Sequence, residues 1–341
     1  MIRTRTICAA LAISMLAAML PQTAFAEENE FIETARLDFD EENVFTQTTN
    51  GFKWKISGSF PAAEGGMGIF DKGESKSDCT VALPENYIYD GTIRLEMRVK
   101  NDVTADAEAK NAAIYFRNSG TDVLRAQVKA DGFMYFQGGT GTGDGRLDIK
   151  TVNTVTDEFY TYTVDFDFNS RKISASVKND NGEELAPKQC ESFDFYKNND
   201  ASALDSILIS KSSSDGRLFV DYISVSKLMS EEEIAQAVLD SIEIESADSI
   251  ISDFTLQKSG AGDAVIEWES ENPQIEIEDS GDRYIAKVTN PEEGSISGIL
   301  RCIVTKGETV LTKEFETTVF HILSDEEKAE QDIAAIDIEN S

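Results

Sequence analysis

The chain has 341 residues and a formal net charge of −32, from 63 acidic and 31 basic residues. Because the acidic residues are spread along the whole chain, their field repels phosphate groups, which excludes nucleic acid and anionic lipid as partners. Three cysteines follow the N-terminal segment, and this small, odd number excludes a disulfide framework. A bond between Cys79 and Cys190 stays open, whereas Cys302 lies in an apolar run and is expected to be a small buried residue.

The first 26 residues have the pattern of a secretory signal peptide. Arg3 and Arg5 precede an apolar run at 7–20, which is shorter than the roughly 20 residues that a membrane helix needs. The triplet Ala-Phe-Ala at 24–26 is a cleavage site, so the mature chain is expected to begin near Glu27 and to be secreted. No cysteine follows the cut, which argues against a lipid anchor, and the later sequence has no apolar stretch long enough to predict a membrane span.

Short alternating strands predict that residues 27–228 form one all-β domain. Apolar and polar side chains alternate there with the period of two that a half-buried strand requires. The first such runs are 36–40, 52–56, 80–83 and 93–99. The clearest pair is a hairpin, in which strands at 160–168 and 171–177 flank a turn at 169–170. Roughly a dozen strands without a convincing helix indicate a two-sheet antiparallel jelly-roll β-sandwich.

This hairpin and the closing run at 216–225, Gly-Arg-Leu-Phe-Val-Asp-Tyr-Ile-Ser-Val, resemble the end of a concanavalin-like or laminin-G-like jelly roll. In that superfamily the last strand commonly has an aspartate between hydrophobic residues and returns beside the first strand. The resemblance implies that residues 216–225 pair with the N-terminal strand.

The composition changes after residue 228. Residues 229–240 carry a serine cap, acidic residues in the first turn and good helix formers, which predicts a short helical linker. Strand patterns then resume, and their spacing predicts a smaller immunoglobulin-like β-sandwich at 241–322. The expected strands are 242–244, 264–268, 284–288, 299–304 and 312–320.

The second module resembles the atrophied bacterial immunoglobulin-like domain. The resemblance is carried by Ile-Glu-Trp-Glu-Ser-Glu-Asn-Pro at 266–273, Val-Thr-Asn-Pro at 288–291 and Phe-Glu-Thr-Thr-Val at 315–319. Asn290 departs from the family pattern, which usually has arginine at this position. Trp268 is expected to be the core tryptophan of the sandwich. The family is often attached to secreted carbohydrate-active enzymes, which is an association and not a site.

A second copy of this module is expected at the C-terminus. Residues from Ser324 onward align with those from Ser230 onward at a constant offset, and the Ile-x-Ile-Glu residues at 242–245 and 336–339 fall in register. The alternative is that two acidic helical segments resemble each other by composition alone. We expect residues 323–341 to be the start of a truncated repeat in a fragment of a longer modular protein. One strand cannot bury an apolar face alone, so this segment is expected to be poorly ordered or helical.

Familiar catalytic motifs are missing from the sequence. Its single histidine, His321, ends an apolar run, which excludes histidine-based triads and multi-histidine zinc sites. Asp165 and Asp167 share a strand face but lack the glutamates of the E-x-D-x-x-E motif of hydrolytic jelly rolls. The glycine-rich run at 138–145 has neither the Lys-Ser/Thr nor the following helix of a phosphate loop. The chain is therefore interpreted as non-enzymatic.

Binding chemistry is the better prediction. Sugar rings stack on aromatic faces and their hydroxyl groups bind polar side chains. The candidate ligand-binding residues are Trp54, Tyr87, Tyr89, Tyr115, Arg117, Tyr135 and Gln137. The alternative is that half or more of these aromatic rings fill the core. A structural calcium ion is a further hypothesis, because jelly-roll modules that resemble this one hold an ion where first and last strands meet. Its expected ligands are Asp38, Asp40 and Asp221.

The leading hypothesis is a secreted, non-catalytic modular protein. Its jelly roll would bind a polysaccharide or a cell-surface glycan, and its immunoglobulin-like module would be a spacer. Three alternatives stay open. The chain could be the N-terminal ancillary part of a larger secreted glycoside hydrolase or polysaccharide lyase, with a catalytic domain on the same parent chain. It could be a cell-surface adhesion or scaffold protein that binds proteins through exposed strand edges. The jelly roll could itself be a hydrolase with an unfamiliar acid pair.

Overall fold

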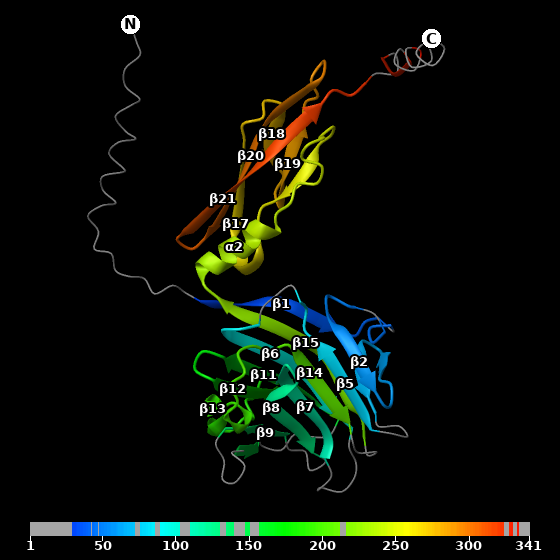
Figure 1. The fold of residues 1–341 in the computed structure, drawn as a ribbon, viewed down its shortest axis with the longest axis vertical. Helices are drawn as coiled ribbons and strands as arrows, with labels where there is room; N and C mark the ends of the chain where they lie inside the picture. Colours follow the sequence, from blue (N-terminus) through cyan, green and yellow to red (C-terminus); the bar gives the residue numbers. More distant parts are fainter. Residues whose placement is uncertain are drawn as a thin grey trace, which may run out of the picture. The chain divides into compact units, whose positions relative to one another are not determined.

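The structure is a computed structural model, and it describes residues 29–323, 327–329 and 333, apart from residues 42, 47, 72–75, 86–88, 103–109, 130–133, 140–146, 151–156 and 212–215. The expected signal peptide and most of the expected second repeat therefore lie outside the described residues. The described chain is divided into two compact units, residues 30–229 and the residues from 230 onward (Figure 1). Within the described residues, no helix has the length and apolar character needed to cross a bilayer.

The first unit is a sandwich of two antiparallel sheets. In the first sheet the order is β13 (Phe193–Asp194), β12 (Lys172–Asn179), β11 (Phe159–Asp167), β6 (Thr92–Asn101), β15 (Leu218–Met229), β4 (Met67–Phe70) and β3 (Ala62–Glu64), with β1 (Glu30–Asp38) also paired to β15. In the second sheet the order is β10 (Leu147–Lys150), β9 (Met134–Gly138), β8 (Thr121–Lys129), β7 (Lys110–Asn118), β14 (Ser206–Lys211), β5 (Ser77–Ala82) and β2 (Lys53–Ser57). Two short 3₁₀ helices, η1 (Lys188–Glu191) and η2 (Tyr196–Asn198), precede β14. We call the first of the two sheets the eight-stranded sheet and the second the seven-stranded sheet.

The register confirms the jelly roll. β1 pairs with the last strand β15 along its whole length, from Glu30 opposite Met229 to Asp38 opposite Tyr222. The hairpin of β11 and β12 also forms, and in its turn the Asp167 carboxylate accepts hydrogen bonds from the backbone N–H groups of Asn169 and Ser170. These N–H groups face no partner strand, so the aspartate satisfies donors that the ladder leaves unpaired.

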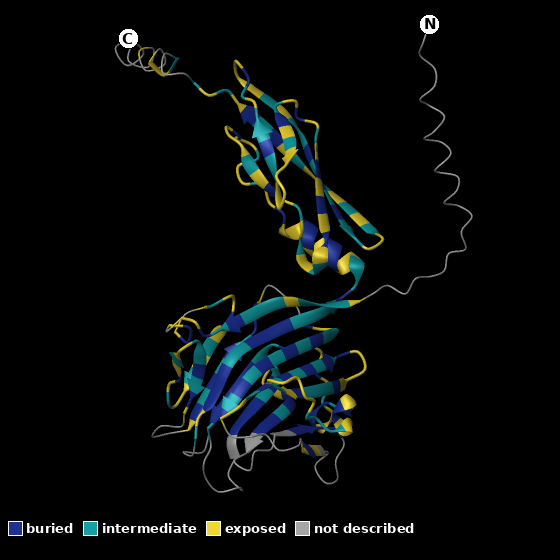
Figure 2. Ribbon diagram, turned by 180° about the vertical axis from the view of Figure 1, so that it is seen from behind, coloured by how far each residue is buried: buried dark blue, intermediate teal, exposed yellow. Residues whose placement is uncertain are grey.

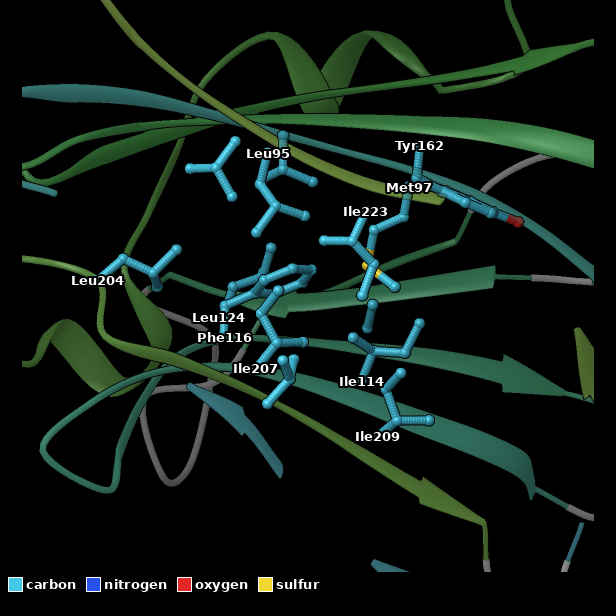
Figure 3. Packing of buried hydrophobic residues seen from close by; sticks show 14 of the residues in the cluster. Leu95, Met97, Ile114, Phe116, Leu124, Tyr162, Leu204, Ile207, Ile209 and Ile223 are labelled. Atoms are coloured by element: carbon cyan, nitrogen blue, oxygen red, sulfur yellow. The ribbon is translucent and has the colours of Figure 1, made fainter. Parts of the chain in front are cut away.

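The core lies between the inner faces of the two sheets. Buried and half-buried residues alternate along β6 and β11, as the period of two requires (Figure 2). Figure 3 shows Leu95 and Met97 of the eight-stranded sheet facing Ile114 and Phe116 of the seven-stranded sheet. Burial of each such side chain stabilises the fold by about 1.5–3 kcal/mol, and this sum is the main force that closes the sandwich.

The second unit consists of a helix and two three-stranded sheets. Helix α2 (Glu231–Ser241) comes first, and the 3₁₀ helix η3 (Ala261–Asp263) lies between the first two strands. One sheet has the order β16 (Phe254–Gln257), β19 (Arg283–Val288), β18 (Ile275–Asp279), and the other β17 (Val265–Ser270), β20 (Ser295–Lys306), β21 (Thr309–Phe320). Trp268 is buried against Phe315, with ring centroids 5.9 Å apart, and its indole Nε1 donates to the Gln257 carbonyl oxygen at 3.0 Å.

The predicted helix forms, with a reciprocal cap. The backbone N–H of Glu233 donates to the Ser230 Oγ, and the backbone N–H of Ser230 donates to the Glu233 carboxylate. The prediction of a strand at 242–244 is wrong. The buried Ile242 ends the helix in an extended conformation, and its carbonyl oxygen accepts a hydrogen bond from the Lys313 Nζ at 2.8 Å, so a side chain replaces a strand partner.

The three described cysteines are free and buried. The bond left open between Cys79 and Cys190 is therefore not formed. Burial raises the pKa of all three thiols, to about 12 for Cys190 and to about 11 for Cys302. They behave as small hydrophobic residues, as expected for Cys302.

Candidate functional site

The outer face of the seven-stranded sheet carries an aligned row of side chains that crosses six of its strands. The cross-strand register places them side by side in the order Thr80, Leu208, Tyr115, Arg125, Gln137 and Asp148. The residues that flank them along the chain, such as Phe116, Ala126 and Phe136, point into the core and line a small apolar cavity between the sheets. Because side chains alternate along a strand, the row itself faces outward.

Asp122 holds two arginines beside this row. Its Oδ1 accepts a hydrogen bond from the Arg117 Nε at 2.7 Å. Its Oδ2 accepts one from the Arg125 Nε at 2.7 Å and lies 2.6 Å from the Arg125 Nη2. The Asp122 side chain is only 8% exposed, whereas those of Arg117 and Arg125 are 25% and 31% exposed. The carboxylate is thus an inner anchor, and the two guanidinium groups are turned toward solvent.

Two tyrosine rings fix the same guanidinium groups. The Tyr115 ring centroid lies 5.1 Å from the Arg117 guanidinium carbon and 5.3 Å from that of Arg125. Arg125 also lies over the ring of Tyr196, at 4.2 Å from its centroid. Cation–π contacts of this kind contribute about 0.5–2 kcal/mol each. Both arginines are therefore held in one orientation before any ligand arrives.

A pair of glutamines continues the polar surface beyond Arg125. The Gln127 Nε2 donates to the Gln137 Oε1 at 3.2 Å. These side chains belong to residues that are only 6% and 4% exposed. Among the described residues, the Gln137 Nε2 and the Gln127 Oε1 have no further hydrogen-bond partner. One donor and one acceptor are therefore left for a ligand in a largely enclosed position.

Three of the predicted ligand-binding residues come together on this face: Tyr115, Arg117 and Gln137. The backbone of Tyr135 lies on the next row, opposite Gln127, and its side chain is outside the described part of the structure, as is the whole of Tyr87. The other two predictions need correction. Trp54 is half-buried and packs against the core, with its ring centroid 4.9 Å from that of Phe45, and Tyr89 is buried.

Four residues of this site were not predicted: Asp122, Arg125, Gln127 and Tyr196. The alternation of Leu124 and Ala126 with Arg125 and Gln127 could have revealed the last two as outward-facing partners. Asp122 carried no such signal, because it is three residues from Arg125 and simple alternation would put the two on opposite faces. A β-bulge, which leaves Val123 without a partner between the Phe116–Leu124 and Arg117–Asp122 pairs, brings Asp122 to the outer face.

Two of the three expected calcium ligands are engaged by arginines. Asp38 accepts hydrogen bonds from the Arg36 Nε at 3.0 and 3.1 Å, and Asp221 accepts one from the Arg98 Nη1 at 2.6 Å. Asp40 follows the end of β1 and is exposed. No group of three acidic, histidine or cysteine side chains in the described residues could hold a metal ion. The donor set at the junction of β1 and β15 thus fits guanidinium groups and does not fit calcium.

The outer face of the eight-stranded sheet is closed by interactions within the protein. Arg94 donates to both carboxylate oxygens of Asp165, at 2.8 and 2.9 Å, and lies 3.9 Å from the ring centroid of Phe31. Arg98 covers the ring of Phe159 in the same way, at 4.1 Å. Asp165 is thus an ion-pair partner of Arg94, while Asp167 caps the hairpin turn.

Comparison with solved structures places the likeness in the first unit. Lectin II from Ulex europaeus is 8% identical with a TM-score of 0.40, and the match covers 57% of this chain and 100% of the lectin. The exoplasmic/lumenal domain of VIP36, in a Ca²⁺/Man3GlcNAc-bound form, is 9% identical with a TM-score of 0.41. The match covers 59% of this chain and 91% of that domain. An endo-1,3-beta-glucanase from Streptomyces sioyaensis is 15% identical with a TM-score of 0.42. The match covers 60% of this chain and 98% of the glucanase.

A search of curated proteins finds no match to the chain. A family match exists for the second unit, where residues 232–322 fit the family described as "Atrophied bacterial Ig domain". The match includes the three sequence motifs around Trp268, Asn290 and Phe315, and it confirms the resemblance that they carry. The chain is an all-β protein in which a jelly-roll sandwich is followed by a module similar to the atrophied bacterial Ig domain.

Proposed function

We propose that this chain is a secreted modular protein that binds a glycan on the outer face of the seven-stranded sheet. One observation carries the proposal. Asp122 and two tyrosine rings orient a pair of arginines, and a buried glutamine pair continues the same polar surface. The signal-peptide pattern of the first 26 residues supports secretion.

The chemistry of this surface suits a sugar. Each sugar hydroxyl both donates and accepts, and the surface offers donors on Arg117 and Gln137 beside an acceptor on Gln127. Because the side chains are already fixed by protein contacts, little conformational entropy is lost on binding. Neighbouring strands lie about 4.8 Å apart, so an extended ligand that crosses the strands meets a new side chain at each step.

Binding without hydrolysis is part of the proposal. Hydrolysis of a glycosidic bond needs two carboxyl groups, one of which is kept protonated by a raised pKa. Asp122 is bound by two guanidinium groups instead. Among the described carboxyl groups, those with a clear shift, such as Asp167 and Glu184, have a lowered pKa, because hydrogen bonds to the carboxylate outweigh the opposing effect of burial. The second unit then serves as a spacer.

A glycan array with the mature chain, residues 27–341, tests the proposal. We expect binding to at least one polysaccharide without release of reducing ends. Gln137→Leu keeps the size of a buried side chain but removes its amide, so it should weaken binding by about tenfold. Gln257→Leu makes the same substitution at an exposed position on β16 of the second unit, and this control should bind like the parent. Failure to bind any glycan, or equal binding by the Gln137 variant, would contradict the proposal.

A further inference from the structure

Resting on this proposed function, we infer that the glycan is acidic and that its carboxylate or sulfate oxygens are bound by Arg117 and Arg125. The unused hydrogen-bond donors point to this ligand. Arg117 contacts Asp122 through Nε alone, so both terminal nitrogens are without a partner among the described residues. Arg125 contacts Asp122 through Nε and Nη2, so its Nη1 is without a partner among the described residues. A planar guanidinium with free terminal N–H groups matches the paired oxygens of an oxyanion.

The local charge balance supports the same ligand. Two guanidinium groups share one carboxylate at this site, which leaves one excess positive charge, and Tyr115 and Gln137 beside them are neutral. The next carboxylate of the row, Asp148, lies opposite Gln137 and is two strands away from Arg125. Among the other described arginines, Arg301 pairs with three glutamates, whereas Arg171 has no carboxylate partner. Arg94 pairs with Asp165, and Arg98 pairs with both Asp180 and Asp221.

The contrast matters because this chain has 63 acidic and 31 basic residues. With so many carboxylates available, an arginine pair that shares a single one differs from Arg98 and Arg301, which have two and three carboxylates. The overall negative field does not prevent binding, since charges farther than about 8 Å are screened at physiological ionic strength. The groups in contact with the ligand therefore decide whether a negatively or a positively charged ligand binds.

The glutamine pair is an independent sign of a built site. Gln127 and Gln137 are more than nine-tenths buried as residues, yet each keeps one amide atom without a protein partner among the described residues. The two unpaired amide atoms are not among the fully buried unsatisfied atoms of the described residues, so they reach the surface, where a ligand or water can bind them. The Gln137 amide N–H group lies one strand away from Arg125, where it can donate to a sugar hydroxyl beside the anionic group.

The test compares the mature chain on three kinds of immobilised polysaccharide. Polygalacturonate carries carboxylates, dextran sulfate carries sulfates, and laminarin is neutral. We expect an acidic polymer to bind at least about tenfold more tightly than laminarin, and the better of the two acidic polymers identifies the oxyanion. Arg117→Gln should lower that affinity by about tenfold or more, because it removes a charged hydrogen-bond donor. Arg117→Lys should recover only part of the affinity, since lysine keeps the charge and lacks the two parallel N–H donors of a guanidinium group.

Arg301→Gln on β20 of the second unit is the control and should bind like the parent. Binding to laminarin alone, or equal affinity of the Arg117→Gln variant and the parent for the acidic polymer, would overturn the acidic ligand and leave glycan binding in place. Failure to bind all three polymers and every array glycan would overturn both. If Arg117→Gln does not fold, competition on the parent chain decides. A monosaccharide that carries the oxyanion of the better polymer, galacturonate or glucose 6-sulfate, must displace that polymer better than the corresponding neutral sugar, and equal displacement refutes the inference.

Discussion

Replacement of Asp122 by asparagine is the most direct test of the site. Asparagine has nearly the same shape, but it keeps a single neutral acceptor and places an NH₂ group against a guanidinium. The change therefore removes the charge that orients Arg117 and Arg125 and leaves the backbone undisturbed. Both the stability of the jelly roll and its ligand binding should fall together.

The expected loss of stability follows from the contacts. Asp122 accepts two charge-assisted hydrogen bonds, one from each arginine, and removing the charged partner of such bonds costs about 1.5–3 kcal/mol. The arginines are 25% and 31% exposed, so water compensates part of the loss, and we expect a decrease of about 2 kcal/mol in the free energy of unfolding. Asp38→Asn is the matched control. It breaks an exposed ion pair with Arg36, which is expected to contribute less than about 1 kcal/mol.

Urea denaturation with fluorescence detection can measure the difference. The chain has two tryptophans, one in each unit, so Trp268→Phe leaves Trp54 as the reporter of the jelly roll. Asp122→Asn and Asp38→Asn are then compared in that background. If Asp122→Asn changes the free energy of unfolding no more than Asp38→Asn does, the carboxylate is not an anchor and the reasoning about the site is wrong.

Three further results are expected. Ser230→Ala removes the reciprocal cap of α2 and should lower the stability of the second unit by about 1 kcal/mol in a thermal melt followed by tryptophan fluorescence; an unchanged melt would contradict this. The Pro291 carbonyl and the Glu327 carboxylate raise the pKa of His321, so their interaction is present at low pH and is lost as the pH rises through that raised value. NMR titration of this single imidazole should show the rise, and Glu327→Gln should reverse part of it. The three buried thiols should react with Ellman's reagent only after denaturation of the mature chain, and fast reaction of the native chain would refute the burial of at least one of them.

Much of the architecture could be predicted because it depends on local alternation. The β11–β12 hairpin has apolar side chains on one face and polar ones on the other, with a polar turn between, and the strands pair as this pattern requires. The return of the last strand beside β1 came from the family resemblance instead, since no local pattern encodes a contact between residues nearly 200 positions apart.

The site was predicted less well, for two physical reasons. Lys53 and Lys55 alternate with Trp54 and Ile56, so the pattern already indicated that the tryptophan faces inward, and its ring area made it a misleading candidate for sugar stacking. Asp122 reaches its position through a bulge, which changes the phase of alternation within one strand and leaves no mark in the spacing of apolar residues. Residues that depend on such irregularities require the three-dimensional structure.

The pairing of β1 with β15 also determines how the jelly roll responds to mechanical load. Glu30 lies opposite Met229, so the two ends of this module leave from the same end of one antiparallel pair. Tension applied along the chain would pull these ends apart at right angles to the strands and break their hydrogen bonds one after another, as in opening a zipper. We expect the module to unravel at low force from this pair, starting at Glu30 and Met229, while β6 and β11 hold the remaining sheet together.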